Sequence, residues 1–184
     1  DLSARIQHII MFTTFLILSF TGWGLKYAYV EPSSAWISVW GGPRIAGIIH
    51  RIAGIAMLLD FIYHQFYLLN LARKKDLRLT IIPMPKDVVD MVHQFMYYLG
   101  LRKERPYFGK FTYLQKFDYW APFTTVLVIG ICGLLLWAPN VTASFLPGWV
   151  FNVATIFHGE LALLALLFLV TVHLFNNHFR PDKF

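Results

Sequence analysis

Four long apolar stretches limit what this chain of 184 residues can fold into. They cover residues 6–25, 45–71, 119–138 and 149–175. A helix needs roughly 20 apolar residues to cross the ~30 Å hydrocarbon core of a bilayer, so each stretch is long enough to span it. In lipid, a helix satisfies all of its backbone polar groups internally. We therefore predict an all-α membrane protein, a bundle of four transmembrane helices.

The composition supports the same fold class. The chain is 57% hydrophobic and only 14% charged, with a mean hydropathy of +0.54, outside the usual range of soluble domains. Four helices with short chain ends leave no room for a separate soluble domain, which predicts one integral membrane domain over residues 1–184. The first apolar stretch lacks a basic start and a small-residue cleavage site, so we expect a spanning helix and not a signal peptide.

Charge is concentrated between the second and third spans. Residues 73–118 carry ten Lys and Arg against five Asp and Glu, whereas the other connections carry few charges. By the positive-inside rule this loop faces the cytoplasm, which places both termini there too. Because topology accounts for the charge, no nucleic-acid partner is expected.

Two connections are expected to hold short helices. Residues 34–40 lie among Tyr and Trp side chains, which collect at membrane interfaces, and predict a surface helix outside. Residues 86–99 repeat apolar side chains at helical spacing, which predicts an amphipathic helix lying on the cytoplasmic membrane surface. His93 falls on this second helix and is interpreted as an interfacial surface histidine.

Six of the seven histidines lie in or at the ends of the spans, two pairs of them at similar spacings. His50 and His64 are 14 residues apart, and His158 and His173 are 15 apart. At about 100° and ~1.5 Å per residue, each pair stays within roughly 60° of one helix face and is separated by ~21 to 22 Å along the axis. Ionisable groups inside a span mark function, and imidazole is among the commonest metal ligands. The pattern predicts two haems stacked across the bilayer.

The alternating direction of the spans sorts the histidines by depth. His50 and His158 lie toward the outer side, while His64 and His173 lie toward the cytoplasm. The two remaining histidines, His8 and His178, open the first span and close the fourth at the cytoplasmic end. This order predicts an outer site of His50 with His158, and an inner site of His173 with either His8 or His64.

Other polar residues near these levels are candidates for supporting roles. Arg51 would pair with a haem propionate, and the acids Asp60 and Glu160 would either carry protons or pair with Arg51. A quinone headgroup near the inner site would find hydrogen-bonding partners in Tyr113, Lys116, Asp118 and Tyr119, although an ordinary interfacial belt predicts the same residues. The single cysteine, Cys132, lacks a C-x-x-C-H pattern, which excludes covalent c-type haem.

Short motifs along almost the whole chain carry a resemblance to a known family. They are Arg5 to His8, Thr21 with Gly22, Gly47 to Gly54, Gln115 to Trp120, and the histidines of the fourth span. The chain resembles the gamma, or cytochrome b, subunit of respiratory formate dehydrogenases and the cytochrome b of membrane-bound nickel-iron hydrogenases. The resemblance implies a prokaryotic inner-membrane subunit of a hetero-oligomeric complex with two b-type haems, His50 and His158 holding the outer one and His8 and His173 the inner one. It also implies that electrons pass from an iron-sulfur partner to menaquinone.

Two features depart from that family. Its members have an apolar residue where this chain has His64, and they space the ligands of the fourth span at roughly 14 residues instead of 15. The ending from His173 to Phe184 is more similar to cytochrome b/b6-like proteins found beside multihaem cytochromes. His64 could therefore replace His8 as inner ligand. Alternatively, His64 with His173 and His8 with His178 would give three haems that pass electrons to a non-quinone carrier.

The function expected from the sequence is that of a membrane b-type cytochrome. Stacked haems would relay electrons between a redox partner and the quinone pool, as an electron-transfer subunit and not a complete enzyme. The rival interpretations are a haem-free proton-coupled carrier using Asp60, Glu160 and the histidines, and a structural anchor without cofactor.

Overall fold

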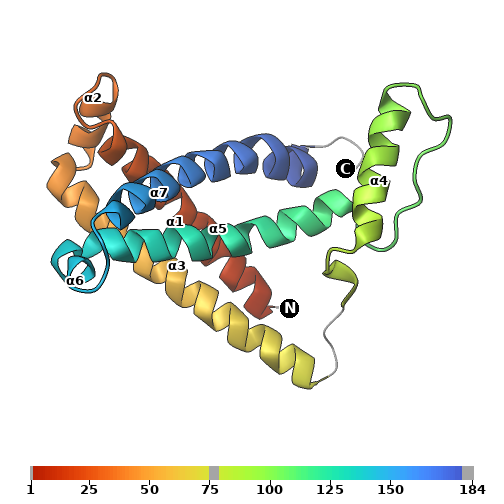
Figure 1. Ribbon diagram of the computed structural model, residues 1–184, viewed down its shortest axis with the longest axis horizontal. Coiled ribbons are helices and arrows are strands. Elements are labelled where there is room, and N and C mark those ends of the chain that lie inside the picture. The colour runs from red at the N-terminus through yellow and green to blue at the C-terminus, as the bar shows by residue number, and fades with distance from the viewer. Residues whose placement is uncertain (1, 75–78, 180–184) are drawn as a thin grey trace. The chain divides into compact units, whose positions relative to one another are not determined.

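The computed structural model describes residues 2–74 and 79–179, and this part of the chain is helical without strands (Figure 1). Four helices are long and apolar enough to cross a membrane. They are α1 (Leu2–Lys26), α3 (Gly42–Arg73), α5 (Tyr113–Trp137) and α7 (Trp149–Phe168). The prediction of an all-α bundle with four membrane-spanning helices is confirmed.

Three of the four spanning helices, α1, α3 and α5, begin before the apolar stretches that predicted them. Helix α5 begins at Tyr113, before the apolar run near residue 119, because a capping box precedes it. The Thr112 hydroxyl accepts a hydrogen bond from the Gln115 backbone N–H (3.2 Å), and the Gln115 side-chain oxygen accepts one from the Thr112 backbone N–H (3.0 Å). This reciprocal arrangement satisfies N–H groups that a helix start leaves without partners.

The fourth span changes its helical form toward the C-terminus. Helix α7 passes into two short π-helical segments, η2 (Leu169–His173) and η3 (Phe175–Phe179). A π-turn holds more residues than an α-turn, and such turns often occur at functional sites. Nothing in the sequence indicated this change.

The short helices expected in the connections are present. Helix α2 (Ser33–Val39) follows α1, and α4 (Pro85–Tyr98) occupies the basic loop, which confirms that both segments are helical. Between α2 and α3, Gly41 and Gly42 adopt positive φ angles of 82° and 84°, a conformation that favours glycine. Two further elements were not predicted, η1 (Leu79–Ile81) and α6 (Pro139–Ala143). Helices α2 and α6 lie at the same end of the spans (Figure 1).

Two compact units divide the chain. The bundle unit comprises Asp1–Tyr67 and Thr125–Phe184 and contains all the histidines except His93. The loop unit comprises Leu68–Thr124 and contains η1, α4 and the first turns of α5.

Packing inside the bundle unit is reversed relative to a soluble protein. Several of its most buried side chains are polar, among them Gln7 (6% exposed) and Thr21 (0%), whereas many large apolar side chains are exposed. This arrangement suits a helix bundle surrounded by lipid, where small and polar residues hold helices together and apolar ones face the acyl chains. It also leaves polar groups in the interior to orient the histidines.

Candidate functional site: two histidine pairs in the bundle unit

His50 on α3 and His158 on α7 face each other in the bundle unit. Their ring centroids are 6.0 Å apart, with an angle of 71° between the ring planes. The two residues are far apart in sequence, so only the packing of α3 against its neighbours brings them together. The structure thus places side by side the two histidines predicted at the outer level.

The His50 ring is oriented by two consecutive residues of α1. Its Nδ1 lies 2.8 Å from the Thr21 hydroxyl oxygen, and that hydroxyl donates to the Ile17 carbonyl at 2.6 Å. Because the hydroxyl proton is engaged there, Nδ1 carries the hydrogen and donates to Thr21. Behind the ring, a Cβ atom on Gly22 would lie 3.1 Å from the His50 Cε1 atom. Gly22 therefore leaves the space that the imidazole occupies.

His158 is held by α5 in the same manner. Its Nδ1 donates to the Ile129 backbone carbonyl at 2.9 Å. A Cβ atom on Gly133 would lie 2.9 Å from the His158 Cε1 atom and 3.2 Å from Nδ1. In both rings Nδ1–H is used by the protein, which leaves Nε2 with a lone pair suited to a metal.

A cavity of about 860 Å³ opens beside this pair. It is lined from α1, α3, α5 and α7, mostly by apolar side chains, together with both histidines and the glycines that support them. Cofactor and small-molecule sites typically occupy about 300–1,000 Å³ and carry a few placed polar groups. The cavity therefore has the size and the lining of a site for a large, mainly apolar cofactor.

A second pair brings together His8 on α1 and His173 at the end of η2. Their ring centroids are 6.3 Å apart, with 27° between the planes. His173 lies in the π-helical segment η2. A π-turn holds one more residue than an α-turn, so His173 has about the register that a spacing of one residue less would give in a regular α-helix. The unusual 15-residue spacing is thus taken up by the backbone.

His64, the competing inner residue, has a different environment. Its Nδ1 lies 2.7 Å from the Gln7 side-chain oxygen, and its ring stacks on Tyr67 with centroids 5.9 Å apart. Gln7 donates in turn to the Ser3 hydroxyl at 3.1 Å. His64 is thus bonded to the residue next to His8. The side chain of His178 lies outside the described part of the chain.

The sequence profile of the prokaryotic cytochrome b561 family matches residues 1–177, nearly the whole chain. The chain belongs to this family. It is therefore a multi-pass membrane cytochrome b that acts in electron transport, and haem b is the cofactor of its family. The resemblance recognised from the sequence motifs is confirmed.

Two curated relatives of this cytochrome are subunits of formate dehydrogenases. The cytochrome b556(fdo) subunit of formate dehydrogenase from Escherichia coli is 25% identical over 175 residues, covering 93% of this chain and 74% of the relative. The cytochrome b556(Fdn) subunit of the nitrate-inducible formate dehydrogenase from the same organism is 22% identical over 174 residues, covering 93% and 72%.

Charged residues of the cytochrome line the cavities in its bundle unit. Arg51 borders the 860 Å³ cavity, and its guanidinium lies 5.8 Å from the Trp137 ring centroid. Glu160, predicted as a proton carrier or a partner of Arg51, forms an ion pair with Lys26 at 2.5 Å. Asp60 lines a separate groove of about 660 Å³ between α1 and α3, together with Ser3 and Tyr63.

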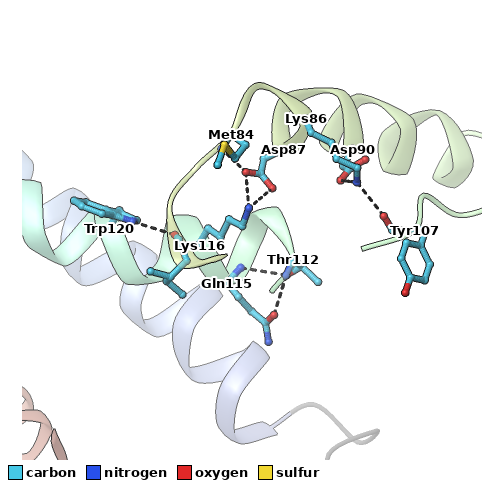
Figure 2. Close-up of polar contacts among 10 residues, drawn as sticks. Met84, Lys86, Asp87, Asp90, Tyr107, Thr112, Gln115, Lys116 and Trp120 are labelled. Atoms are coloured by element: carbon cyan, nitrogen blue, oxygen red, sulfur yellow. Dashed lines mark hydrogen bonds and ion pairs between the residues drawn. The ribbon is translucent and has the colours of Figure 1, made fainter. Parts of the chain in front are cut away.

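The loop unit holds the other residues predicted near a quinone, and Figure 2 shows the contacts of one of them, Lys116. Lys116 on α5 is only 9% exposed, and its ammonium binds both carboxylate oxygens of Asp87 on α4, at 2.9 and 2.8 Å. Tyr113 packs its ring against Phe108, and Tyr119 packs against Trp120. Asp118 lies in the second turn of the same helix, α5. Lys116 is thus engaged in joining two helices.

The contact with Lys116 lies on the polar face of α4, and this face is the buried one. The polar residues Asp90 and Gln94 are buried, at 7% and 5% exposure, while Val88, Val92 and Phe95 are exposed. Lys86 reinforces the buried polar side by binding Asp90 at 2.6 Å and the Tyr107 carbonyl at 3.1 Å. The helix therefore uses its polar face to contact the protein and leaves its apolar face for lipid, as expected of an amphipathic helix at a membrane surface.

Replacing Lys116 with alanine should loosen α4. The hydrogen bond from Lys116 is the main cause that lowers the pKa of Asp87 below its ordinary value. The carboxylate therefore contributes fully above its unfolded-state pKa of about 4, and the contribution is lost as the pH falls through the lower folded-state value. Removing one member of this partly buried, hydrogen-bonded pair should cost about 1 to 3 kcal/mol, so amide exchange over residues 85–98 should accelerate by roughly tenfold at neutral pH. An unchanged exchange rate, matching that of the exposed control Lys110→Ala, would contradict the role of this pair.

Proposed function

We propose that this cytochrome relays electrons across the membrane through two haems, each bound between two histidines. His50 and His158 hold the outer haem, and His8 and His173 hold the inner one. The spacing of the two ring pairs is the observation that carries the proposal.

The spacing has a simple chemical reason. An imidazole nitrogen lies about 2 Å from a first-row metal ion and the ring centre about 1 Å further, so two imidazoles on opposite sides of one iron have centroids about 6 Å apart. The observed separations are 6.0 and 6.3 Å. Two pairs of histidines thus have the separation that one iron between them requires.

The surroundings of the outer pair support the same assignment. A metal-binding histidine usually donates its second ring N–H to a neighbouring acceptor, which fixes the tautomer and the ring orientation. Thr21 and the Ile129 carbonyl supply these acceptors, and Gly22 and Gly133 leave room for the rings. The cavity beside them has room for the macrocycle.

The bound haem supplies a one-electron iron couple, and the chain sets the conditions in which it works. The histidines provide axial ligands, and the apolar helices exclude water and lower the local dielectric, which together tune the potential. The two sites lie along the fourth span, at position 158 on α7 and position 173 at the end of η2, so the relay would run along the axis of this span. By the positive-inside rule, the basic loop supports an orientation with the inner site and both termini on the cytoplasmic side of the prokaryotic inner membrane.

The two formate dehydrogenase relatives support a choice of partners for this cytochrome. Both belong to formate dehydrogenases, which supports a hetero-oligomeric complex in which an iron-sulfur or multihaem subunit exchanges electrons with the outer haem. The quinone pool, menaquinone or a similar quinone, would exchange electrons on the inner side. In the loop unit, Tyr113, Asp118 and Tyr119 are the candidates for the quinone, with Lys116 as the residue that holds the neighbouring helix in place. Asp60, in the bundle unit, is a separate candidate for carrying protons.

The test is a haem count with a spectrum. The purified protein should show a reduced-minus-oxidised α band of b-type haem and about two haems per chain by pyridine haemochrome assay. A preparation with full membrane insertion but no α band would overturn the proposal and favour the haem-free carrier. Adding a menaquinol analogue tests the exchange of electrons with a quinone separately from haem binding. Haems that are bound to the protein but stay oxidised would exclude this quinol as an electron donor.

A further inference from the structure

Lys26, the last residue of α1, lies directly against the helix that carries His158. A Cβ atom on Gly159 would be 3.5 Å from the Lys26 Nζ atom and 3.7 Å from its Cδ and Cε atoms. Gly159 therefore leaves a bare patch of α7 on which the lysine side chain rests, one residue from the outer histidine.

Glu160 fixes the ammonium in this position. The Lys26 Nζ atom lies 2.5 Å from the Glu160 Oε1 atom, and 5.5 Å from the centre of the Tyr27 ring. The lysine side chain is 29% exposed and that of the glutamate 60%, so the positive charge is the more enclosed member of the pair. Both residues line the 860 Å³ cavity, as does His158.

A charge fixed beside a low-dielectric cavity acts on any redox centre placed there. Reducing ferric to ferrous haem adds one electron and makes the site more negative by one unit. A nearby positive charge stabilises this change and a nearby negative charge opposes it, more strongly in a low dielectric than in water.

We propose that Lys26, positioned by Gly159 and Glu160, is an electrostatic residue that raises the reduction potential of the outer haem, and that Glu160 offsets part of this effect. The inference rests on the proposed function, because it requires a haem between His50 and His158. In this proposal the Lys26–Glu160 ion pair does more than join α1 to α7.

A purely structural role and an electrostatic role of the Lys26–Glu160 pair predict different effects of the two substitutions on the reduction potential. If the pair only fastens helices, removing either charge weakens the same contact, and both substitutions act alike. If it tunes the haem, Lys26→Gln lowers the potential of the outer haem and Glu160→Gln raises it. Glutamine keeps much of the length and the hydrogen-bonding ability of each side chain.

The experiment is a spectroelectrochemical redox titration of the purified full-length cytochrome. The outer haem is identified as the component missing from His158→Ala. We expect a negative shift of that component in Lys26→Gln, a positive shift in Glu160→Gln, and wild-type values in Lys26→Arg, which keeps the charge. The inner haem should not shift, and Lys103→Gln in the basic loop should leave both components unchanged.

The outcomes distinguish a failure of this inference from a failure of the proposed function. Potentials that do not move, shifts of the same sign, or loss of the outer haem in both variants would assign the pair a structural role and overturn the inference, while leaving the relay intact. A wild-type protein without haem would overturn the proposed function itself.

Discussion

Replacing Gly133 with valine should cost this cytochrome its outer haem. A Cβ atom at this position would lie 2.9 Å from the His158 Cε1 atom, closer than real Cβ contacts, and 3.2 Å from Nδ1, which is tighter than most of them. Valine adds two further methyl groups, so the ring must rotate away and break its hydrogen bond to the Ile129 carbonyl. The iron would lose an oriented ligand, and the haem content should fall from about two per chain to about one.

The measurement is again the pyridine haemochrome assay, on protein purified to the same helical content by circular dichroism. Gly133→Ala should give an intermediate result, because only the ring edge has to move by a few tenths of an ångström. Gly148→Ala is the matched control, since a Cβ atom there has nothing within 4 Å. Two intact haems in Gly133→Val would show that His158 is not held as an axial ligand at this place.

The fold of this cytochrome was largely predictable because its helices obey one strong constraint. An apolar run of about 20 residues has few alternatives in a bilayer, and periodicity identifies an amphipathic helix such as α4 without knowledge of its neighbours. Helix ends were less predictable. The start of α5 depends on the reciprocal bonds of Thr112 and Gln115, and the end of the fourth span on a π-helical backbone that leaves no clear mark in the residues.

The candidate site was predictable only in part. Residue type and depth identified the histidines, and the pairing of His50 with His158 agreed with the geometry. The features that orient the rings were not visible in the sequence. A backbone carbonyl such as that of Ile129 carries no side-chain signal, and glycines such as Gly22 and Gly133 serve equally in ordinary helix packing. The ion pair of Lys26 with Glu160 joins residues 134 positions apart, a distance no local pattern could bridge.

Helix α3 shows what spacing alone does not reveal. His50 and His64 repeat at nearly the same interval as the histidines of the fourth span, but spacing does not say what each ring contacts. The His50 ring faces His158, and the His64 ring bonds to Gln7 and stacks on Tyr67. Because Gln7 precedes His8, the contact from His64 reaches α1 one residue from the pair of His8 and His173. In the proposed pairing, His64 would support the inner site without binding its iron.

The second large effect should follow from His173→Ala, which removes one of the two rings of the inner pair. With a single histidine left, we expect the inner haem to be lost, so that one haem per chain remains and menaquinol analogues no longer reduce the protein. His8→Ala should have the same result, because the two rings lie 6.3 Å apart and the proposed inner haem needs both of them as ligands.

His64→Ala separates this arrangement from its alternatives. Removing the bond to Gln7 leaves the His8 and His173 rings in place, so the protein should keep two haems, with at most a modest change in the inner potential. His93→Ala, on the loop helix, is the control. If His64→Ala instead loses the inner haem while His8→Ala keeps it, His64 is the ligand and the pairing proposed here is wrong. A wild-type count of three haems that falls in both variants would favour the tri-haem relay, because His8 and His64 would then each serve a separate iron.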